Sequence, residues 1–320
     1  MSSIEKSILE TIIYFDIFDY PLRVNEIQKW LWKNKAEINE TTSALNESQF
    51  LMEKLSSKDG FFFFPPKADP PLAEKGREGL IETRLKKYRF AEEKYKKAKR
   101  IIWILSKFPF VYGVAVCNDL GYSNSAKNGD IDLFIITKKN RVWTVRFLIV
   151  SFLKIFRLRP GETHLNAICP SFFVDEDHLN LRNFSAINPP EDDIHFAYWI
   201  NQMTPVFGTE PLWERFYKEN DWTADSLPNC RLFLTSPVRK IKISFIQKFG
   251  EIILFKFLAD FVENFLRLKF LPEKIKEGMN RDNGVVIKEG ILKLHTNDRR
   301  REYFKIFQER ISKIIPNYSN

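Results

Sequence analysis

The sequence predicts an α+β protein of 320 residues, and three observations carry that prediction. Apolar residues recur at three- and four-residue spacing over long stretches, which is typical of helices that bury one face. Two short apolar runs, 110–117 and 131–136, have the length of buried strands and flank a polar loop. From residue 185 onward the apolar runs again suit helices. The chain therefore predicts a small mixed β-sheet between helical segments.

Composition and charge narrow the class of protein. Fifty Lys and Arg residues against 41 Asp and Glu residues give a formal net charge of +9, which favours a polyanionic partner. Cys117, Cys169 and Cys230 never form a Cys-x-x-Cys pair, so neither disulfides nor structural zinc are expected. The N-terminus has no export signal, and charges interrupt the two most apolar stretches. We therefore expect a cytoplasmic protein without a membrane span.

Residues 1–66 are predicted to form an N-terminal domain. Ser2 and Glu5 have the spacing of a capping box before a first helix, and a third helix is expected over 42–55. An Asp-Gly turn then leads into the apolar strand 61–64. Three helices followed by a hairpin resemble a winged helix, a DNA-binding variant of the helix-turn-helix. The third helix lacks an arginine-rich face, so packing or protein contact is the alternative to DNA reading.

Residues 67–107 are predicted to be a proline-rich linker followed by a long amphipathic helix over 79–107. Between Lys75 and Lys107 the chain carries twelve basic and four acidic residues, a local charge of +8. Lysine-rich stripes bind phosphates without reading sequence, so this helix is a candidate surface for a nucleic acid. A solvated helix face is the alternative interpretation.

Residues 108–184 hold the pattern that carries chemistry. Asp130 and Asp132 open the second apolar strand, and alternating strand residues project to one side with Cα atoms roughly 6.6 Å apart. Two carboxylates so placed can hold Mg²⁺ or Mn²⁺. These acids open their strand, whereas in metal-dependent sugar transferases and aspartyl phosphatases the acidic motif follows one.

A strand, a small-residue loop and an Asp-x-Asp that leads a second strand, all within 117–136, resemble the DNA polymerase beta-like nucleotidyltransferase superfamily. With the winged-helix-like start and the later Arg141 and Arg146, the chain is similar to a prokaryotic branch of that superfamily. The resemblance implies a nucleotidyltransferase core, a nucleoside triphosphate substrate, and Asp130 and Asp132 as catalytic ligands of Mg²⁺ or Mn²⁺.

The resemblance also implies nucleotide-binding residues. The candidates in the loop and the following helix are Asn118, Asp119, Ser123, Asn124, Arg141 and Arg146. In the family the loop usually begins with Gly-Ser, but Asn118 and Asp119 stand in that place here. The two arginines would meet the charge of the triphosphate, while an exposed helix with arginines lying over Trp143 is the alternative.

The third carboxylate of the family comes from a later strand. The matching strand here is 165–174, which contains no acid, and the acids Asp175, Glu176 and Asp177 follow its end. We expect Asp175 or one of its two neighbours to complete the metal site with Asp130 and Asp132.

The rest of the chain, 185–320, is predicted to be helical. The basic stretch from Lys293 to Arg301 offers either a substrate contact or a charged helix cap. Dinucleotide, Walker, zinc-protease and serine-hydrolase motifs are absent. The sequence thus predicts a metal-dependent transferase that moves a nucleoside monophosphate from a nucleoside triphosphate to an acceptor hydroxyl. The alternative is a catalytically degenerate nucleotidyltransferase fold that acts as a nucleic-acid-binding regulator.

Overall fold

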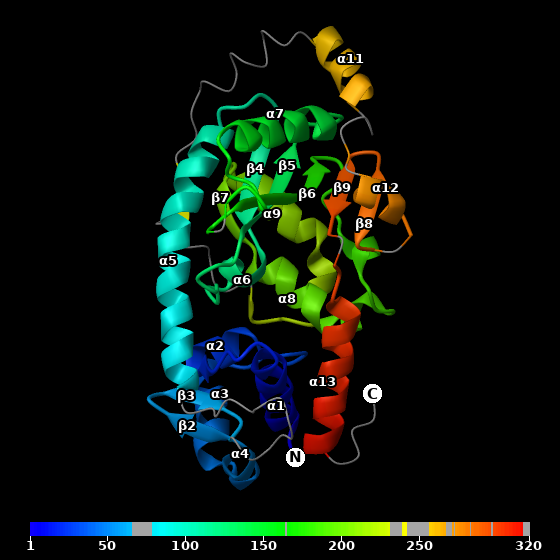
Figure 1. Ribbon diagram of the computed structural model, residues 1–320. Helices are drawn as coiled ribbons and strands as arrows, with labels where there is room; N and C mark the ends of the chain where they lie inside the picture. The colour runs from blue at the N-terminus through cyan, green and yellow to red at the C-terminus, as the bar shows by residue number, and fades with distance from the viewer. Residues whose placement is uncertain are drawn as a thin grey trace.

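The chain combines a small N-terminal sheet with a larger, mixed sheet that has helices on both faces (Figure 1). The α+β class with a mixed sheet is therefore confirmed. The computed structural model describes residues 1–65, 79–163, 165–230, 239–241, 256–266, 271, 273–281, 283–295 and 297–315.

The N-terminal segment alternates helices with three short antiparallel strands in the order β1-β3-β2. Its elements are α1 (Ser3–Asp16), β1 (Leu22–Arg23), α2 (Val24–Lys29), α3 (Ile38–Glu47), α4 (Gln49–Lys54), β2 (Ser56–Lys58) and β3 (Phe61–Phe63). The capping box at Ser2 and the hairpin are present as expected. The helix expected over 42–55 is instead two helices, because Ser48 takes an extended backbone conformation and caps Leu51 with its side chain.

The N-terminal segment shares its hydrophobic core with later elements, namely α8 (Ile194–Gln202) and α13 (Arg300–Ile314). Tyr14 of α1 stacks on Tyr198 of α8 with ring centroids 4.3 Å apart. Arg310 of α13 pairs with Asp16 at 2.6 Å. Residues 1–65 are thus part of a core that extends to the C-terminal helix. The proline-rich linker lies outside the described residues.

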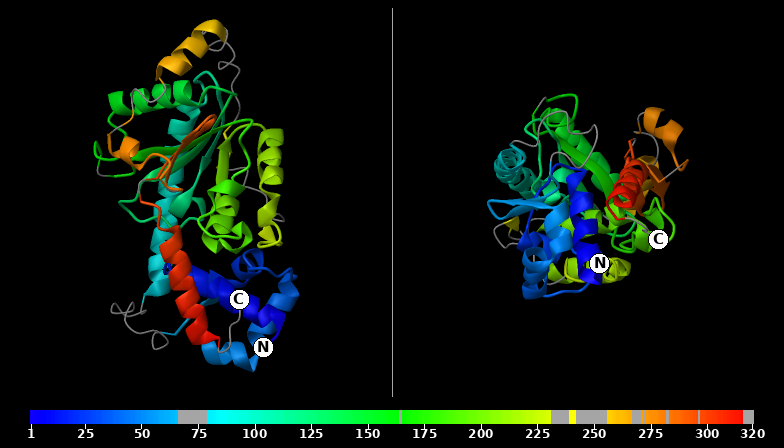
Figure 2. Two further views of the ribbon diagram at one scale, coloured as in Figure 1. Left: turned by 90° about the vertical axis from the view of Figure 1, so that its right-hand side faces the viewer. Right: turned by 90° about the horizontal axis from the view of Figure 1, so that it is seen from below.

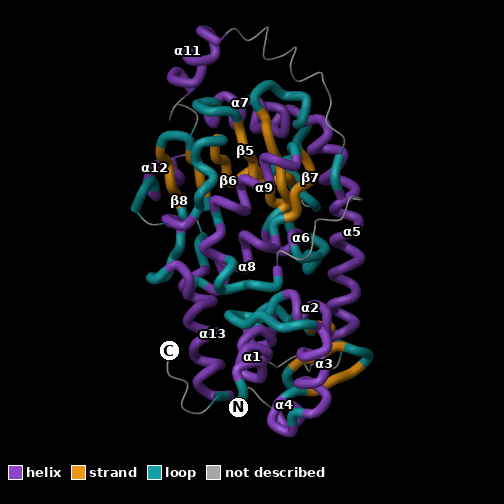
Figure 3. The backbone as a smooth tube through the Cα atoms, turned by 180° about the vertical axis from the view of Figure 1, so that it is seen from behind, coloured by secondary structure: helices purple, strands orange, loops and turns teal. Residues whose placement is uncertain are grey.

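The expected basic helix is α5 (Leu80–Leu105), which runs alongside both the N-terminal segment and the larger sheet (Figure 1; from behind in Figure 3). Ala91, Ala98, Ile102 and Leu105 are fully buried on the side that faces the sheet. The apolar spacing therefore predicted the buried face correctly only for the second half of α5, because Leu85 and Tyr88 in its first half are exposed.

The larger sheet has six strands in the order β7-β4-β5-β6-β9-β8. Its strands are β4 (Val111–Val116), β5 (Ile131–Thr137), β6 (Ile168–Asp175), β7 (Thr204–Phe207), β8 (Val285–Lys288) and β9 (Ile291–Leu294). The β5 and β6 strands are parallel, and the other neighbours are antiparallel.

Three of these six strands come from the region expected to be helical, so that prediction is wrong and the sheet is not confined to 108–184. Each of β7, β8 and β9 has only four residues, too few for a clear alternation of apolar and polar positions. Gly290 closes the β8–β9 turn with a φ of 68°, and a Cβ there would lie 2.1 Å from the Nδ1 atom of His178.

Helices cover both faces of the larger sheet (Figure 2). One face packs on α5 and α7 (Val142–Ile155), and the other on α8 and α9 (Glu210–Glu219). The helix α11 (Lys256–Leu266) contacts α7, where Glu263 accepts hydrogen bonds from Trp143 N and Thr144 N. The remaining helical elements are α6 (Asn118–Gly121), α12 (Glu273–Gly278) and the 3₁₀ turns Arg182–Phe184, Pro190–Asp192 and Asp221–Thr223. Within the described residues, no helix has the length and apolar character needed to cross a membrane.

Strand alternation sorts the residues of β5 between these faces. Leu133 and Ile135 point into the α5 and α7 layer, and Phe134 and Ile136 point into the α8 and α9 layer. Asp132 has the same parity as Phe134, so it faces the α8 side.

Candidate functional site

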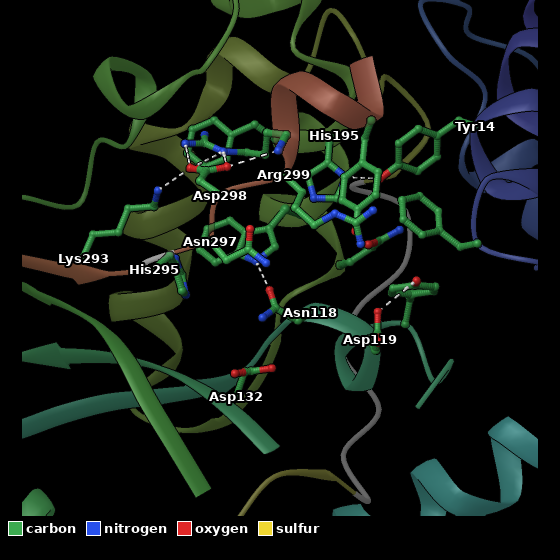
Figure 4. A pocket seen from close by; sticks show the side chains of 17 residues that line it. Tyr14, Asn118, Asp119, Asp132, His195, Lys293, His295, Asn297, Asp298 and Arg299 are labelled. Atoms are coloured by element: carbon green, nitrogen blue, oxygen red, sulfur yellow. Dashed lines mark hydrogen bonds and ion pairs between the residues drawn. The ribbon is translucent and has the colours of Figure 1, made fainter. Parts of the chain in front are cut away.

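A cavity of about 360 Å³ opens on the α8 side of the sheet, beside the start of β5 (Figure 4). Segments from both ends of the chain and from its centre form its walls. Its lining residues are Tyr14, Phe18, Asn118, Asp119, Tyr122, Asp132, His195, Phe196, Trp199, Gln202, Lys293, His295, Asn297, Asp298, Arg299, Arg300 and Tyr303.

The two predicted catalytic acids lie at the edge of this cavity. Asp132 is half-buried and lines it, while Asp130 is exposed just before β5 begins. Burial raises the pKa of Asp132 to about 6, and the negative charge of Asp130 adds to that rise. Hydrogen bonds from Asn118 and Cys169 lower the pKa and only partly compensate. The Asp132 carboxylate is therefore poorly stabilised by the protein itself.

Two of the four predicted loop residues reach the cavity. Asn118 accepts a hydrogen bond from Trp199 Nε1 at 2.7 Å, and it connects α8 to Asp132. Asp119 accepts a bond from the Tyr122 hydroxyl at 3.4 Å. Nearby protein atoms desolvate the Asp119 carboxyl and raise its pKa, although the charges of two lysines oppose the rise.

The other two loop residues, Ser123 and Asn124, do not line the cavity. The Ser123 hydroxyl accepts a hydrogen bond from Arg239 at 3.0 Å, and the Asn124 amide donates to the Phe18 carbonyl at 3.3 Å. Both side chains are buried and hold the loop in place. The structure thus gives no support for their contact with a nucleotide.

A lysine from α5 also positions the acidic loop. Lys94 is buried, and its Nζ atom donates to the carbonyls of Ala126 at 2.6 Å and Gly129 at 2.5 Å. Burial lowers the pKa of Lys94, while the negative charge of Asp130 opposes that effect. The sequence analysis included Lys94 in the basic surface of this helix. Its place on the apolar side of α5, next to Tyr95, indicates burial instead.

Asp175 does not join Asp130 and Asp132, the two predicted catalytic acids, so its prediction as a metal ligand is wrong. It pairs with Thr137 in the parallel register of β5 and β6, five residues beyond Asp132, roughly 17 Å along the strand. Glu176 and Asp177 lie at the same distant end, where both contact Lys139. The reason is the register, because Asp175 ends β6 and the other two acids follow it, whereas Asp130 and Asp132 lie at the start of β5.

Cys169 stands where a β6 carboxylate would be needed. It is the register partner of Asp132, and its thiol hydrogen-bonds to that carboxylate. Burial raises the pKa of the Cys169 thiol to about 12, so the thiol stays protonated at neutral pH. Within the described part of the chain, no three His, Cys, Asp or Glu side chains form a group that could hold a metal ion.

Neither predicted arginine reaches the cavity, so both predictions are corrected. Arg141 begins α7 beyond the far end of β5 and pairs with Asp260 at 2.6 Å. Arg146 lies on α7, which covers the opposite face of the sheet from Asp132. Sequence proximity to the Asp-x-Asp strand was misleading because β5 carries the chain away from its acids before α7 begins.

The wall across from Asp132 comes from the basic stretch 293–301. Asp298 accepts hydrogen bonds from the backbone and side chain of Arg300, the shortest from Nη2 at 2.6 Å, and one from Lys293 at 2.9 Å. Burial raises the pKa of Asp298, but the bonds and charges of these two cations outweigh it and hold the pKa below its ordinary value. Arg299 is nearly half exposed and lies over the Tyr303 ring.

Two partly buried histidines complete this wall in their neutral form. Burial lowers the pKa of His295 to about 3 and that of His195 to about 4. His295 hydrogen-bonds to the Ser171 hydroxyl at 2.8 Å, and His195 to the Tyr14 hydroxyl at 2.9 Å. Figure 4 shows the pair of Tyr14 and His195 on the far side of Arg299 from Lys293. Local sequence carried no signal for this wall, since its residues meet only through tertiary packing.

The cavity therefore joins an acidic edge to a wall of cations and aromatic rings. Magnesium is typically held by one or two carboxylates together with the phosphates of a substrate, and aromatic rings suit a planar base. Comparisons with protein-family models, with curated proteins and with solved structures find no match to this chain.

Proposed function

We propose that this protein binds a nucleoside triphosphate as its Mg²⁺ or Mn²⁺ complex in the cavity beside β5. The observation that carries the proposal is the placement of Asp132 in that cavity, with Asp130 two residues before it at the start of β5. The acids form the edge where a divalent ion is favoured, and the opposite wall offers Arg299 to the phosphates.

The donor set fits a hard cation. Asp130 and Asp132 would hold the ion through carboxylate oxygens, and the ion would neutralise the charge of the phosphates. The protein's own part is to orient the nucleotide. Asn118 fixes Asp132 relative to α8, and the rings of Tyr14 and Tyr303 offer stacking surface to a base.

The carboxylate set favours binding without transfer. Activation of an acceptor hydroxyl needs a further group to bind the second ion or take the proton. Cys169 occupies the neighbouring position on β6, and Asp175 lies at the other end of the strands. We therefore propose a nucleotide-binding regulator built on a nucleotidyltransferase-like core.

Nucleotidyl transfer is the second candidate, and one observation favours it. The negative charge of Asp119 contributes to the raised pKa of Asp132, which places a third carboxylate near the pair from α6 rather than from β6. Transfer would use Asp119 in the place of the missing strand acid.

Calorimetric titration of Mn²⁺ together with each ribonucleoside triphosphate tests the binding. We expect Asp132→Asn to lower the affinity for the metal–nucleotide complex at least tenfold. Asp177→Asn is the matched control, because that acid is exposed at the other end of the sheet and should leave binding unchanged. Equal affinities of parent and Asp132→Asn would refute the site.

Incubation with labelled nucleoside triphosphates, Mg²⁺ or Mn²⁺ and cell extract separates the two candidates. Binding without any labelled acceptor supports the regulator. A labelled acceptor that disappears in Asp119→Asn supports transfer.

A further inference from the structure

Exposed apolar side chains gather where α5 and α7 end. Trp103, Ile155 and Phe156 have 51%, 74% and 61% of their surface exposed. The Phe156 ring contacts that of Phe152 with centroids 4.8 Å apart, and Phe152 contacts Phe108, the third residue after α5, at 5.7 Å. These ring contacts bring the two helix ends together (Figure 1). We call these five residues the α5–α7 patch.

Cations border this patch on both of its sides. At the end of α5, the Nζ atom of Lys107 lies over the Trp103 ring, 4.0 Å from its centroid. At the end of α7, Lys154 and Arg157 are exposed directly before and directly after residues 155–156. The aliphatic stems of such side chains lie along apolar surface while their charged groups stay in water. The patch is therefore apolar at its centre and positively charged at its border.

Acidic residues are absent from the parts of the sequence that form the patch. The chain contains no Asp or Glu over 94–118 or over 141–161. Glu263 of α11 contacts α7 at the opposite end of that helix, through the amides of its first turn. A partner of the patch is therefore expected to be anionic as well as apolar.

We propose that the α5–α7 patch binds the surface of a membrane that contains anionic lipids. At such a surface, phenylalanine and isoleucine side chains enter the acyl boundary, tryptophan lies at the level of the headgroups, and lysine and arginine meet the lipid phosphates. A second copy of the chain fits less well as the occupant. Two-fold pairing of this patch would bring the charges of Lys154 and Arg157 from both copies together.

Membrane binding at this patch leaves the cavity of Asp132 open. The patch lies at the ends of α5 and α7, which cover one face of the sheet, and the cavity lies on the α8 side. The inference therefore stands independently of the proposed nucleotide binding, and Asp132→Asn should bind vesicles like the parent.

Vesicle co-sedimentation of the full chain tests the proposal. We expect binding to vesicles of phosphatidylcholine mixed with phosphatidylglycerol, and at least tenfold weaker binding to phosphatidylcholine alone. The double variant Ile155→Ser, Phe156→Ser should lose at least tenfold in affinity for the mixed vesicles at an unchanged melting temperature, because both side chains are exposed. Met52→Ser is the matched control, because this exposed residue lies on α4 at the other end of the molecule (Figure 1), and its binding should equal that of the parent.

Two further measurements separate the apolar and the charged parts of the contact. Quenching of tryptophan fluorescence by brominated lipids should be partly lost in Trp103→Phe, because that ring lies at the bilayer. Lys154→Gln with Arg157→Gln should weaken binding to the mixed vesicles and reduce its salt dependence.

Equal vesicle binding by the parent and the double serine variant would overturn the proposal. A dimer that forms without lipid and is lost in the double serine variant would also overturn it, since a second copy would then cover the patch. Sedimentation velocity at several protein concentrations measures that dimer.

Discussion

The two ends of the parallel pair β5 and β6 carry aspartates in opposite conditions. At one end Asp175 is fully buried and accepts hydrogen bonds from Asn140 N and Asp177 N, both at 3.1 Å, and from His178 Nδ1 at 2.6 Å. At the other end Asp132 is half-buried, and burial raises its pKa.

The difference shows how one residue type serves two purposes in one sheet. The donors of Asp175 all come from neighbouring segments of the protein, so its charge stabilises the fold. The charge of Asp132 is opposed by burial and by a second acid, so an external cation would stabilise it. A carboxylate with few internal donors is the better candidate for a ligand site.

The largest effect should follow from removing the satisfied acid. Asp175→Ala leaves three donors of a fully buried site without their acceptor, so we expect the free energy of unfolding to fall by about 3 kcal/mol. Asp177→Ala, at the same end but more exposed, should stay close to the parent. Urea unfolding measures this free energy in the parent and in both variants. If the two variants lose equally little, Asp175 does not stabilise the fold.

The effect of Asp132 should instead appear in the pH dependence of metal binding. Protons compete with the metal for Asp132, whose pKa is raised to about 6. The affinity for Mn²⁺ should therefore fall about tenfold per pH unit below pH 6 and level off above it. In Asp130→Asn the inflection should move to lower pH, because the neighbouring negative charge is gone. A flat Mn²⁺ profile between pH 5 and pH 7 would contradict the assignment.

The folding stability of the chain also depends on the protonation of Asp132. Its pH dependence is opposite to that caused by an ion-paired acid, whose pKa is lowered in the folded state. The pKa of Asp132 is higher in the folded chain than its ordinary value of 3.8, so the folded state holds the proton more firmly. Its stabilising effect is fully present below pH 3.8 and is lost as the pH rises through about 6. Above pH 6 and without metal, Asp132→Asn should therefore be more stable than the parent.

A smaller effect is expected when a third carboxylate is added beside Asp132. Cys169→Asp places an acid beside Asp132 on the next strand, so Mn²⁺ affinity at pH 7.5 should rise about tenfold. Without metal the added charge should lower the free energy of unfolding by about 1 kcal/mol. Cys169→Asn controls for polarity alone. An equal gain of Mn²⁺ affinity in the asparagine variant would show that charge is not the cause.

The sequence predicted the strand that contains Asp132 correctly, because the signals of a strand lie in adjacent residues. Strand alternation placed Asp132 on one face, and the apolar run after it identified β5. The distant end was misjudged because the register of β5 against β6 is set by packing, so Asp175 could not be located from its distance along the chain. The strands β8 and β9 were not predicted, because they are too short to show a clear alternation of apolar and polar residues.

The remaining walls of the cavity could not be predicted, for a related reason. Tyr14 and Tyr303 are 289 positions apart in the sequence, and only the shared core of α1, α8 and α13 brings them together. The stretch that contains Lys293 and Asp298 was predicted only as a basic segment that offers a substrate contact or a charged helix cap. Its hydrogen-bonded arrangement around Asp298 depends on β9, which the sequence did not reveal.

The smallest expected effect concerns nucleic-acid binding by the exposed cations of α5. Lys94 and Lys97 donate to backbone carbonyls, so they are poor candidates for nucleic-acid contact. The exposed cations of α5 are Lys86, Arg89, Lys96 and Arg100. Changing these four to Gln should reduce the salt slope of single-stranded oligonucleotide binding by roughly 0.7 for each phosphate that is no longer neutralised, with little dependence on sequence.

The variant Lys94→Gln distinguishes oligonucleotide binding on α5 from Mn²⁺ binding at Asp130 and Asp132. That lysine holds the carbonyls of the loop before Asp130, so its loss should weaken Mn²⁺ binding, yet oligonucleotide affinity should stay at the parental value. Fluorescence anisotropy at several salt concentrations measures the oligonucleotide affinity, and Mn²⁺ titration measures the metal affinity. If Lys94→Gln weakens oligonucleotide binding as much as the fourfold variant does, the nucleic acid contacts the acidic loop and not the exposed cations of α5. An unchanged salt slope in the fourfold variant would leave α5 with only its packing role, in which its buried face supports the sheet and Lys94 fixes the loop before Asp130.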